Sequence, residues 1–70
     1  MYKKLIEEIE KNNITYKELA ITLEVEKEET IEKMLKGKKA IFLIDAFKII
    51  KLLEERANKK YNIEELFIIE

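Results

Sequence analysis

The chain has 70 residues, and its 14 Lys or Arg and 15 Asp or Glu nearly cancel. Seventy residues make one small domain, near the lower size at which a single hydrophobic core holds a fold unaided. The absence of cysteine and histidine excludes disulfides, thiolate metal sites, the usual zinc ligands and the common serine and cysteine triads.

The opening stretch predicts an amphipathic helix. Its apolar residues recur at spacings of three and four and are Tyr2, Leu5, Ile6 and Ile9. This spacing places them on one helical face. Asn12 and Asn13 should end the helix, because asparagine favours turns and accepts the left-handed backbone region.

The stretch from Thr15 to Gly37 predicts two short helices joined by a tight turn. Thr15 can cap the first helix with Glu18 as its capping-box partner. The second begins after Val25 and ends at Gly37, the only glycine, which suits the position just past a helix end. The inner faces are Leu19, Ala20 and Leu23 in the first helix and Ile31, Met34 and Leu35 in the second. Two helices joined in this way form a helix-turn-helix, whose second helix can enter a DNA major groove.

A basic connector, Lys38-Lys39, leads to a long helix from about Leu43 to Ala57. We expect this helix to form the backbone of the core, because it has a wide apolar face. The face consists of Leu43, Ala46, Phe47, Ile49, Ile50 and Leu53.

Asn62 can cap a short final helix, Ile63 to Phe67, that returns Leu66 and Phe67 to the core. With no proline and one glycine to interrupt the pattern, the sequence predicts a single, free-standing all-α domain of five short helices over residues 1–70.

Charge is unevenly distributed along the chain. Residues 1–32 contain five Lys and nine Glu, residues 33–60 contain nine Lys or Arg and three acids, and residues 61–70 contain three Glu and no base. The basic middle could meet the phosphates of a nucleic acid. A solvated surface rich in Lys and Glu explains the same distribution.

The order of these elements resembles the Cro and lambda-repressor type of helix-turn-helix regulators, also called XRE-like. Ile14, Thr15, Glu18, Leu19 and Ala20 look like the family's "(L/I)T-x-x-E-L-A" second helix, and TIEKMLKGK, from Thr30 to Lys38, resembles the end of its recognition helix and the closing turn. IFLIDAFKIIKLL and YNIEELF are similar to the fourth and fifth helices of small phage-repressor-like members from Gram-positive bacteria. The resemblance covers nearly the whole chain and implies a lambda-repressor-like DNA-binding domain with a recognition helix at about 27–36.

The resemblance also implies two sets of DNA contacts. Base edges would be met by the first turn of the recognition helix and by a residue one turn later, namely Lys27, Glu28, Glu29, Thr30 and Lys33. Phosphates would be met by Tyr16, Lys17, Lys36, Lys38 and Lys39. Lysines are also favoured near a helix C-terminus by the helix dipole, and the ring of Tyr16 could instead cover the edge of the core.

Acidic residues depart from the family's pattern in the recognition helix. Glu24 to Glu32 holds five Glu and one Lys, which would direct carboxylates at a polyanion, although a single Glu can accept a hydrogen bond from cytosine N4. The helix dipole favours acids in a first turn. The stretch is therefore either a well-capped, solvated helix end or a functional acidic face. The segment from Val25 to Gly37 is also one residue longer than the commonest family pattern.

Several apolar residues stand where the family is usually polar. They are Ile21, Phe42 at the cap of the fourth helix, Ile44, Ile68 and Ile69. A small domain seldom leaves a contiguous apolar patch without a partner. We therefore expect a homodimer, with Phe42, Ile44, Ile68 and Ile69 as the patch that meets the second copy or another partner. Scattered single exposures or a wider core would need no partner.

The leading interpretation is a cytoplasmic DNA-binding transcriptional regulator of phage or mobile-element type, which acts as a dimer on double-stranded DNA. The alternative is a protein-interaction module on the same scaffold, an adaptor, antirepressor or DNA mimic that uses the acidic helix face. An enzyme is not expected, because His, Cys, Ser and a Gly-rich phosphate loop are all missing. We expect no metal, no cofactor and no membrane contact.

Overall fold

Five helices and no strand form along residues 1–70, all of which the computed structural model describes. They are α1 (Lys3–Lys11), α2 (Tyr16–Leu23), α3 (Glu28–Leu35), α4 (Leu43–Ala57) and α5 (Ile63–Leu66). The all-α prediction is confirmed, and α4 has the predicted bounds. No helix has the length and apolar character that crossing a membrane requires.

The ends of α1, α2 and α3 share one backbone arrangement. Each helix is followed by a residue with positive φ, and these residues are Asn13 (56°), Glu24 (58°) and Gly37 (81°). After α3, the Gly37 amide donates to the Met34 carbonyl at 3.1 Å, and the Lys38 amide donates to the Lys33 carbonyl at 2.9 Å. This is the Schellman pattern, which satisfies carbonyls that a helix end leaves free. The turns at Asn13 and Gly37 are as predicted, whereas the positive φ of Glu24 was not foreseen.

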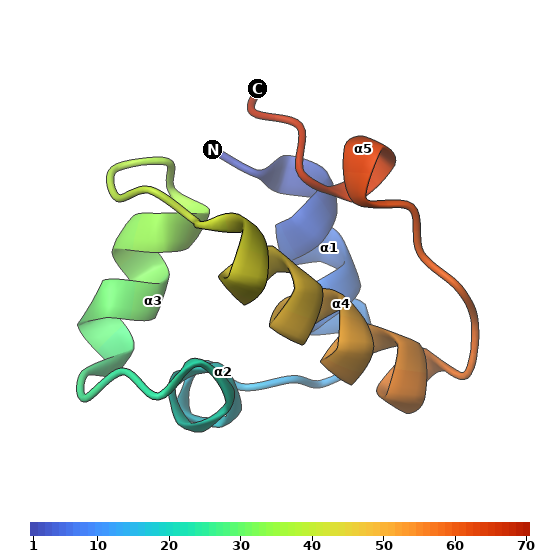
Figure 1. The fold of residues 1–70 in the computed structure, drawn as a ribbon, viewed down its shortest axis with the longest axis horizontal. Coiled ribbons are helices and arrows are strands. Elements are labelled where there is room, and N and C mark those ends of the chain that lie inside the picture. Colours follow the sequence, from blue (N-terminus) through green and yellow to red (C-terminus); the bar gives the residue numbers. More distant parts are fainter.

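One hydrophobic core receives residues from all five helices. α4 crosses the molecule diagonally in Figure 1 and buries Ile49, Ile50 and Leu53. The predicted core role is wrong for Leu43 and Phe47, which are 63% and 55% exposed. Burial along α4 starts only at Ala46, so the first turn of this helix projects beyond the elements that cover its middle.

Helix α2 packs against both α3 and α4, and α5 contacts α1 and α4. Figure 1 looks down the axis of α2 while α3 lies across the line of sight, so these two helices cross steeply.

Both chain ends lie on the same side of the molecule. The Met1 ammonium donates to the Glu70 carbonyl at 3.2 Å, and the Glu70 amide donates to the Met1 carbonyl at 2.9 Å.

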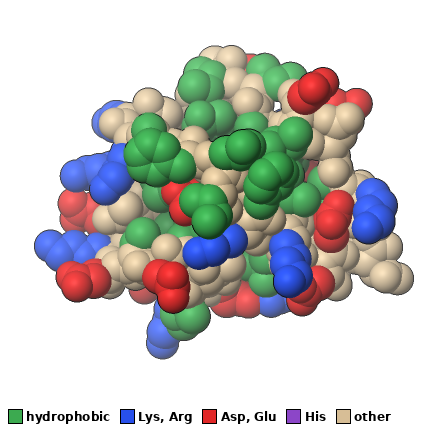
Figure 2. All heavy atoms as spheres, in the orientation of Figure 1, with side chains coloured by type: hydrophobic (Ala, Val, Ile, Leu, Met, Phe, Trp, Pro, Cys, Tyr) green, Lys and Arg blue, Asp and Glu red, His purple; other side chains and the backbone are tan.

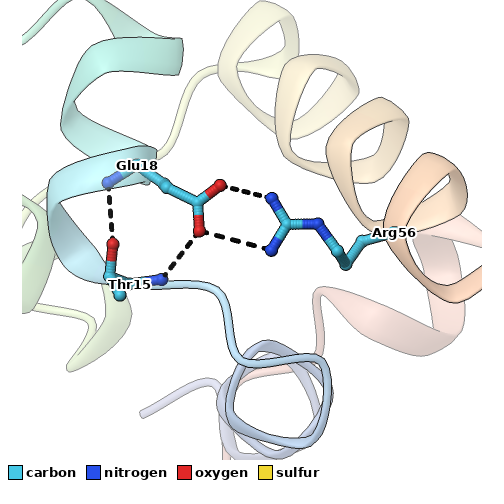
Figure 3. Close-up of polar contacts among 3 residues, drawn as sticks. All are labelled: Thr15, Glu18 and Arg56. Atoms are coloured by element: carbon cyan, nitrogen blue, oxygen red, sulfur yellow. Dashed lines mark hydrogen bonds and ion pairs between the residues drawn. The ribbon is translucent and has the colours of Figure 1, made fainter.

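Glu18 ties the start of α2 to the end of α4 (Figure 3). Its amide donates to Thr15 Oγ1 at 3.1 Å, and its carboxylate accepts from the Thr15 amide at 3.4 Å, which confirms the predicted capping box. The same carboxylate accepts from both terminal nitrogens of the Arg56 guanidinium. This guanidinium holds the pKa of the Glu18 carboxyl below its ordinary value. The contact fixes α2, and with it the turn into α3, relative to α4.

Glu8 makes a second polar link between distant parts of the chain. This carboxylate is buried and accepts a hydrogen bond from the Tyr61 hydroxyl at 2.7 Å. The hydrogen bond lowers the pKa of Glu8 and outweighs the opposing effect of burial. Glu8 thereby holds the segment before α5 against α1.

Candidate nucleic-acid interface

The predicted base-contact residues all lie on α3 or at its first end. Lys27 is the N-cap residue of α3, although its side chain makes no capping hydrogen bond. Lys27, Glu28, Glu29 and Lys33 are exposed, and Thr30 is half-buried. The opposite face of α3 buries Ile31, Met34 and Leu35 in the core, as the sequence predicts. The outer face of α3 is therefore a charged surface that is available to a partner.

Two of the predicted DNA-contacting lysines are paired with acids of their own helix. Lys33 Nζ lies 3.5 Å from Glu29 Oε1, and Lys36 Nζ donates to Glu32 Oε1 at 2.8 Å. The Glu32 carboxylate raises the pKa of Lys36, and the Lys36 ammonium lowers the pKa of Glu32. The spacing of four residues in both pairs is typical of ion pairs on one helical face, a signal in the sequence that the predicted DNA contacts did not take into account. The positive charges of Lys33 and Lys36 are therefore partly neutralised within the protein itself.

The turn after α3 carries two lysines without such partners. Lys38 and Lys39 are exposed and form no ion pair in the structure. Their amides donate to the Lys33 carbonyl at 2.9 and 3.3 Å, so the backbone of the turn is fixed to the end of α3. We call residues Gly37, Lys38 and Lys39 the basic turn. Its ammonium groups are free to meet an anion beside α3.

The start of α2 carries the remaining two predicted phosphate contacts, Tyr16 and Lys17. The Tyr16 phenol makes a small contribution to the raised pKa of Lys36, after the dominant effect of Glu32. The Tyr16 side chain is 37% exposed and is not part of the core. Lys17 is exposed and makes no ion pair. Tyr16 and Lys17 are therefore both accessible to a partner at the start of α2.

A shallow polar depression runs along the outer face of α3. It is lined by Glu29, Glu32, Lys33, Lys36 and Lys38. No group of three acidic side chains lies close enough together to hold a metal ion. The depression offers alternating charges and no apolar floor, so its contacts with a ligand would be electrostatic and hydrogen-bonding.

The acidic residues before and at the start of α3 are only partly compensated. Glu24 lies 3.8 Å from Lys48 Nζ, whereas Glu26 and Glu28 are exposed and form no ion pair. The first turn of α3 carries Glu28 and Glu29, where the helix dipole favours negative charge. One end of α3 is therefore acidic and the other is basic.

Hydrophobic side chains form a second surface feature, over the start of α4 and the chain ends (Figure 2). Phe42, Ile44, Ile68 and Ile69 are between 50% and 67% exposed, as expected for the predicted patch. Leu43 and Phe47, which were predicted to be core residues, add to this surface. We call these six residues the apolar patch. Ile21 is 69% exposed on α2, outside the patch.

Comparison with known proteins adds no relative. No protein-family model matches the chain, and no curated protein or solved structure was found to be similar to it.

Proposed function

We propose that this protein is a cytoplasmic DNA-binding transcriptional regulator of phage or mobile-element type that acts as a homodimer, with α3 in the major groove. The observation that carries the proposal is the basic turn, whose two unpaired lysines stand at the end of an exposed helix. A short helix that packs steeply against its predecessor and buries one face is the shape that helix-turn-helix proteins present to DNA.

Phosphate contacts would come from three places around α3. The basic turn would contact one stretch of the DNA backbone. Tyr16 and Lys17 would contact DNA phosphates from the start of α2. Lys36 would need to exchange Glu32 for a phosphate, and its contact is therefore the weaker one. Such contacts position a protein on DNA without reading its sequence.

Base contacts would come from the outer face of α3, from its N-cap Lys27 to Lys33 in its last turn. Lys27 and Lys33 can donate to guanine, Thr30 can contact several bases, and a Glu can accept from cytosine N4. The exposure of Lys27 and Lys33 supports this role, and the half-burial of Thr30 limits its reach.

The test is the binding of a labelled random-sequence duplex, followed by fluorescence anisotropy at low and near-physiological salt. A Lys38→Ala/Lys39→Ala variant should bind on the order of tenfold more weakly, and its slope of log affinity against log salt should fall by about 2, because each lysine neutralises about one phosphate. The matched control is Lys3→Ala/Lys4→Ala, which removes two adjacent exposed lysines from α1.

Two results would contradict the proposal. Wild-type protein that fails to bind DNA even at low salt excludes a simple DNA-binding regulator. Equal losses in the two double variants would show that binding follows net charge and does not use the basic turn.

A protein-interaction module is the second candidate function. It is favoured by Glu26 and Glu28, which project from the α2–α3 turn and the start of α3 without a cationic partner. In this role the acidic end of α3 would bind a basic protein surface or imitate DNA phosphates.

A further inference from the structure

A polar cavity lies on the side of the molecule away from α3. It opens between α1, the loop after α4 and the start of α5, and it has a volume of about 170 Å³. In Figure 1 this loop is on the right and α3 is on the left, so the cavity is separate from the basic turn and from the outer face of α3. Its polar lining includes Lys4, Glu8, Lys60, Asn62 and Glu65.

Tyr61 fixes the wall that the loop contributes to the cavity. The Tyr61 hydroxyl donates to Glu8 Oε1 at 2.7 Å, and the Tyr61 amide donates to Glu54 Oε2 at 3.0 Å. Lys59 Nζ lies 5.0 Å from the centre of the Tyr61 ring, a distance at which a cation is attracted to an aromatic face. Tyr61 is therefore held by its backbone, its ring and its hydroxyl, and the cavity is formed before any ligand binds.

Glu8 places a nearly buried carboxylate in the cavity, because only 9% of this residue is exposed. The pKa of Glu8 lies below its ordinary value, chiefly because of the Tyr61 hydrogen bond, so the carboxylate is negative at neutral pH. Its Oε1 accepts from Tyr61 and lies 3.8 Å from Lys59 Nζ, whereas Oε2 accepts no hydrogen bond from the chain. No buried side-chain atom of this protein lacks a hydrogen-bond partner, so Oε2 keeps contact with solvent. It is an acceptor suited to a positively charged donor.

The opening of the cavity carries donors. Lys4 and Lys60 are exposed and form no ion pair. Asn62 Oδ1 accepts from the Glu64 amide at 2.8 Å, which leaves the NH₂ group of this side chain free to donate. Glu65, also exposed, adds one negative charge. Two ammonium groups and an amide are donors that a carboxylate ligand accepts.

We propose that this cavity binds a small zwitterion, a free α-amino acid, with its ammonium group on Glu8 and its carboxylate on the donors at the opening. A simple anion would be repelled by the Glu8 carboxylate, and a simple cation by the lysines, whereas a ligand with both charges has a partner for each. Pockets for drug-sized ligands take about 300–1,000 Å³, so this smaller cavity suits a molecule with few non-hydrogen atoms. The inference does not depend on the proposed function in DNA binding.

Titration of the ¹⁵N-labelled protein with glycine, at pH 7 and constant ionic strength, tests the site. Glycine should cause saturable shifts in the amide signals of residues 59–62 and of α1 around Glu8. Its dissociation constant should be in roughly the millimolar range, because so small a ligand makes few contacts. Acetate and methylammonium each carry only one of the two charges and should bind about tenfold more weakly.

Two double variants with the same change in net charge identify the donors. Lys4→Met/Lys60→Met should weaken glycine binding about tenfold, because it removes two charged donors from the opening. Lys38→Met/Lys39→Met removes the two unpaired lysines of the basic turn and should leave glycine binding unchanged. Circular dichroism should show equal helix content in both variants and the wild type.

Glu8→Gln tests the contact with the ammonium group. Glutamine keeps an acceptor for the Tyr61 hydroxyl but carries no charge. Glycine binding should therefore weaken about tenfold, while acetate binding should strengthen because its repulsion by the carboxylate is removed. A merely structural role for Glu8 would weaken the binding of both.

Three results would overturn the inference. Wild-type protein that shows no saturable shift with glycine has no amino-acid site. Acetate that binds as tightly as glycine would make the cavity a site for simple anions. Equal losses in the two lysine variants would show that glycine responds to net charge alone. None of these measurements involves DNA, so the inference and the proposed function can fail independently.

Discussion

Glu24 carries the turn between α2 and α3 in an unfavourable backbone conformation. Its φ of 58° lies in the left-handed region, which costs an L-residue with a Cβ about 1–2 kcal/mol. The side chain is 82% exposed and approaches Lys48 at 3.8 Å, an exposed contact of little energetic value. The conformation is nevertheless kept, because the Val25 amide reaches the Ala20 carbonyl at 2.9 Å only when the chain turns in this way.

Glu24→Gly should therefore stabilise the protein. Glycine removes the steric cost. It also makes the unfolded chain more flexible, which lowers stability by about 0.4–1 kcal/mol. The net gain in the free energy of unfolding should therefore be about 0.5–1 kcal/mol. Urea unfolding measures it. Glu24→Ala is the control, since it removes the carboxylate and keeps the Cβ. A Glu24→Gly variant no more stable than Glu24→Ala would contradict this, because the left-handed conformation would then cost no more than the added flexibility of glycine in the unfolded chain.

At the scale of the element, α3 has opposite charges at its two ends. The pairs Glu29–Lys33 and Glu32–Lys36 neutralise its middle, which leaves Glu28 at the first end and the basic turn at the last. A helix with this polarity approaches a polyanion with its basic end first. The acids at the other end lower its affinity for DNA, or they serve a basic protein partner.

Neutralising those acids tests whether α3 lies beside the phosphates of bound DNA. Glu26→Gln/Glu28→Gln should raise affinity for a random duplex roughly threefold to tenfold, because it removes repulsion from phosphates beside α3. Glu7→Gln/Glu10→Gln makes the same change in net charge on exposed positions of α1 and should have a much smaller effect. Equal gains from both variants would indicate that α3 does not lie near the phosphates.

Local patterns predicted the elements of this fold well. The capping box at Thr15 and Glu18, the Asn13 and Gly37 turns and the bounds of α4 depend on residues close together in sequence, and the structure contains all of them. The depth of burial along α4 was harder to predict. Periodicity shows that Leu43 and Phe47 share a stripe with core residues, but it does not show how far neighbouring helices extend along that stripe.

Long-range pairings could not be predicted from the sequence. Arg56 meets Glu18 across 38 residues, and in a chain with 15 acidic residues no local signal selects that partner. The residues of the candidate site were predicted from the sequence. Which of their charges are paired with one another was not. The structure shows which lysines have acidic partners and which, like Lys38 and Lys39, have none.

On the scale of the whole molecule, the basic turn lies in the chain between the two candidate binding surfaces. The charged outer face of α3 precedes it, and the apolar patch starts three residues after it. The Glu18–Arg56 contact and the core hold α2, α3 and α4 in one arrangement. A ligand on α3 and a partner on the patch would therefore bind to helices that share one core, joined by the short connector between α3 and α4.

The most direct measurement is a titration of ¹⁵N-labelled protein with a short DNA duplex, followed by the backbone amide signals of every residue. DNA binding as proposed predicts that the largest shifts fall on α3, on Gly37 to Lys39 and on the start of α2 at Tyr16 and Lys17. Shifts confined to α1 and the loop before α5, or no shifts at low salt, would contradict it.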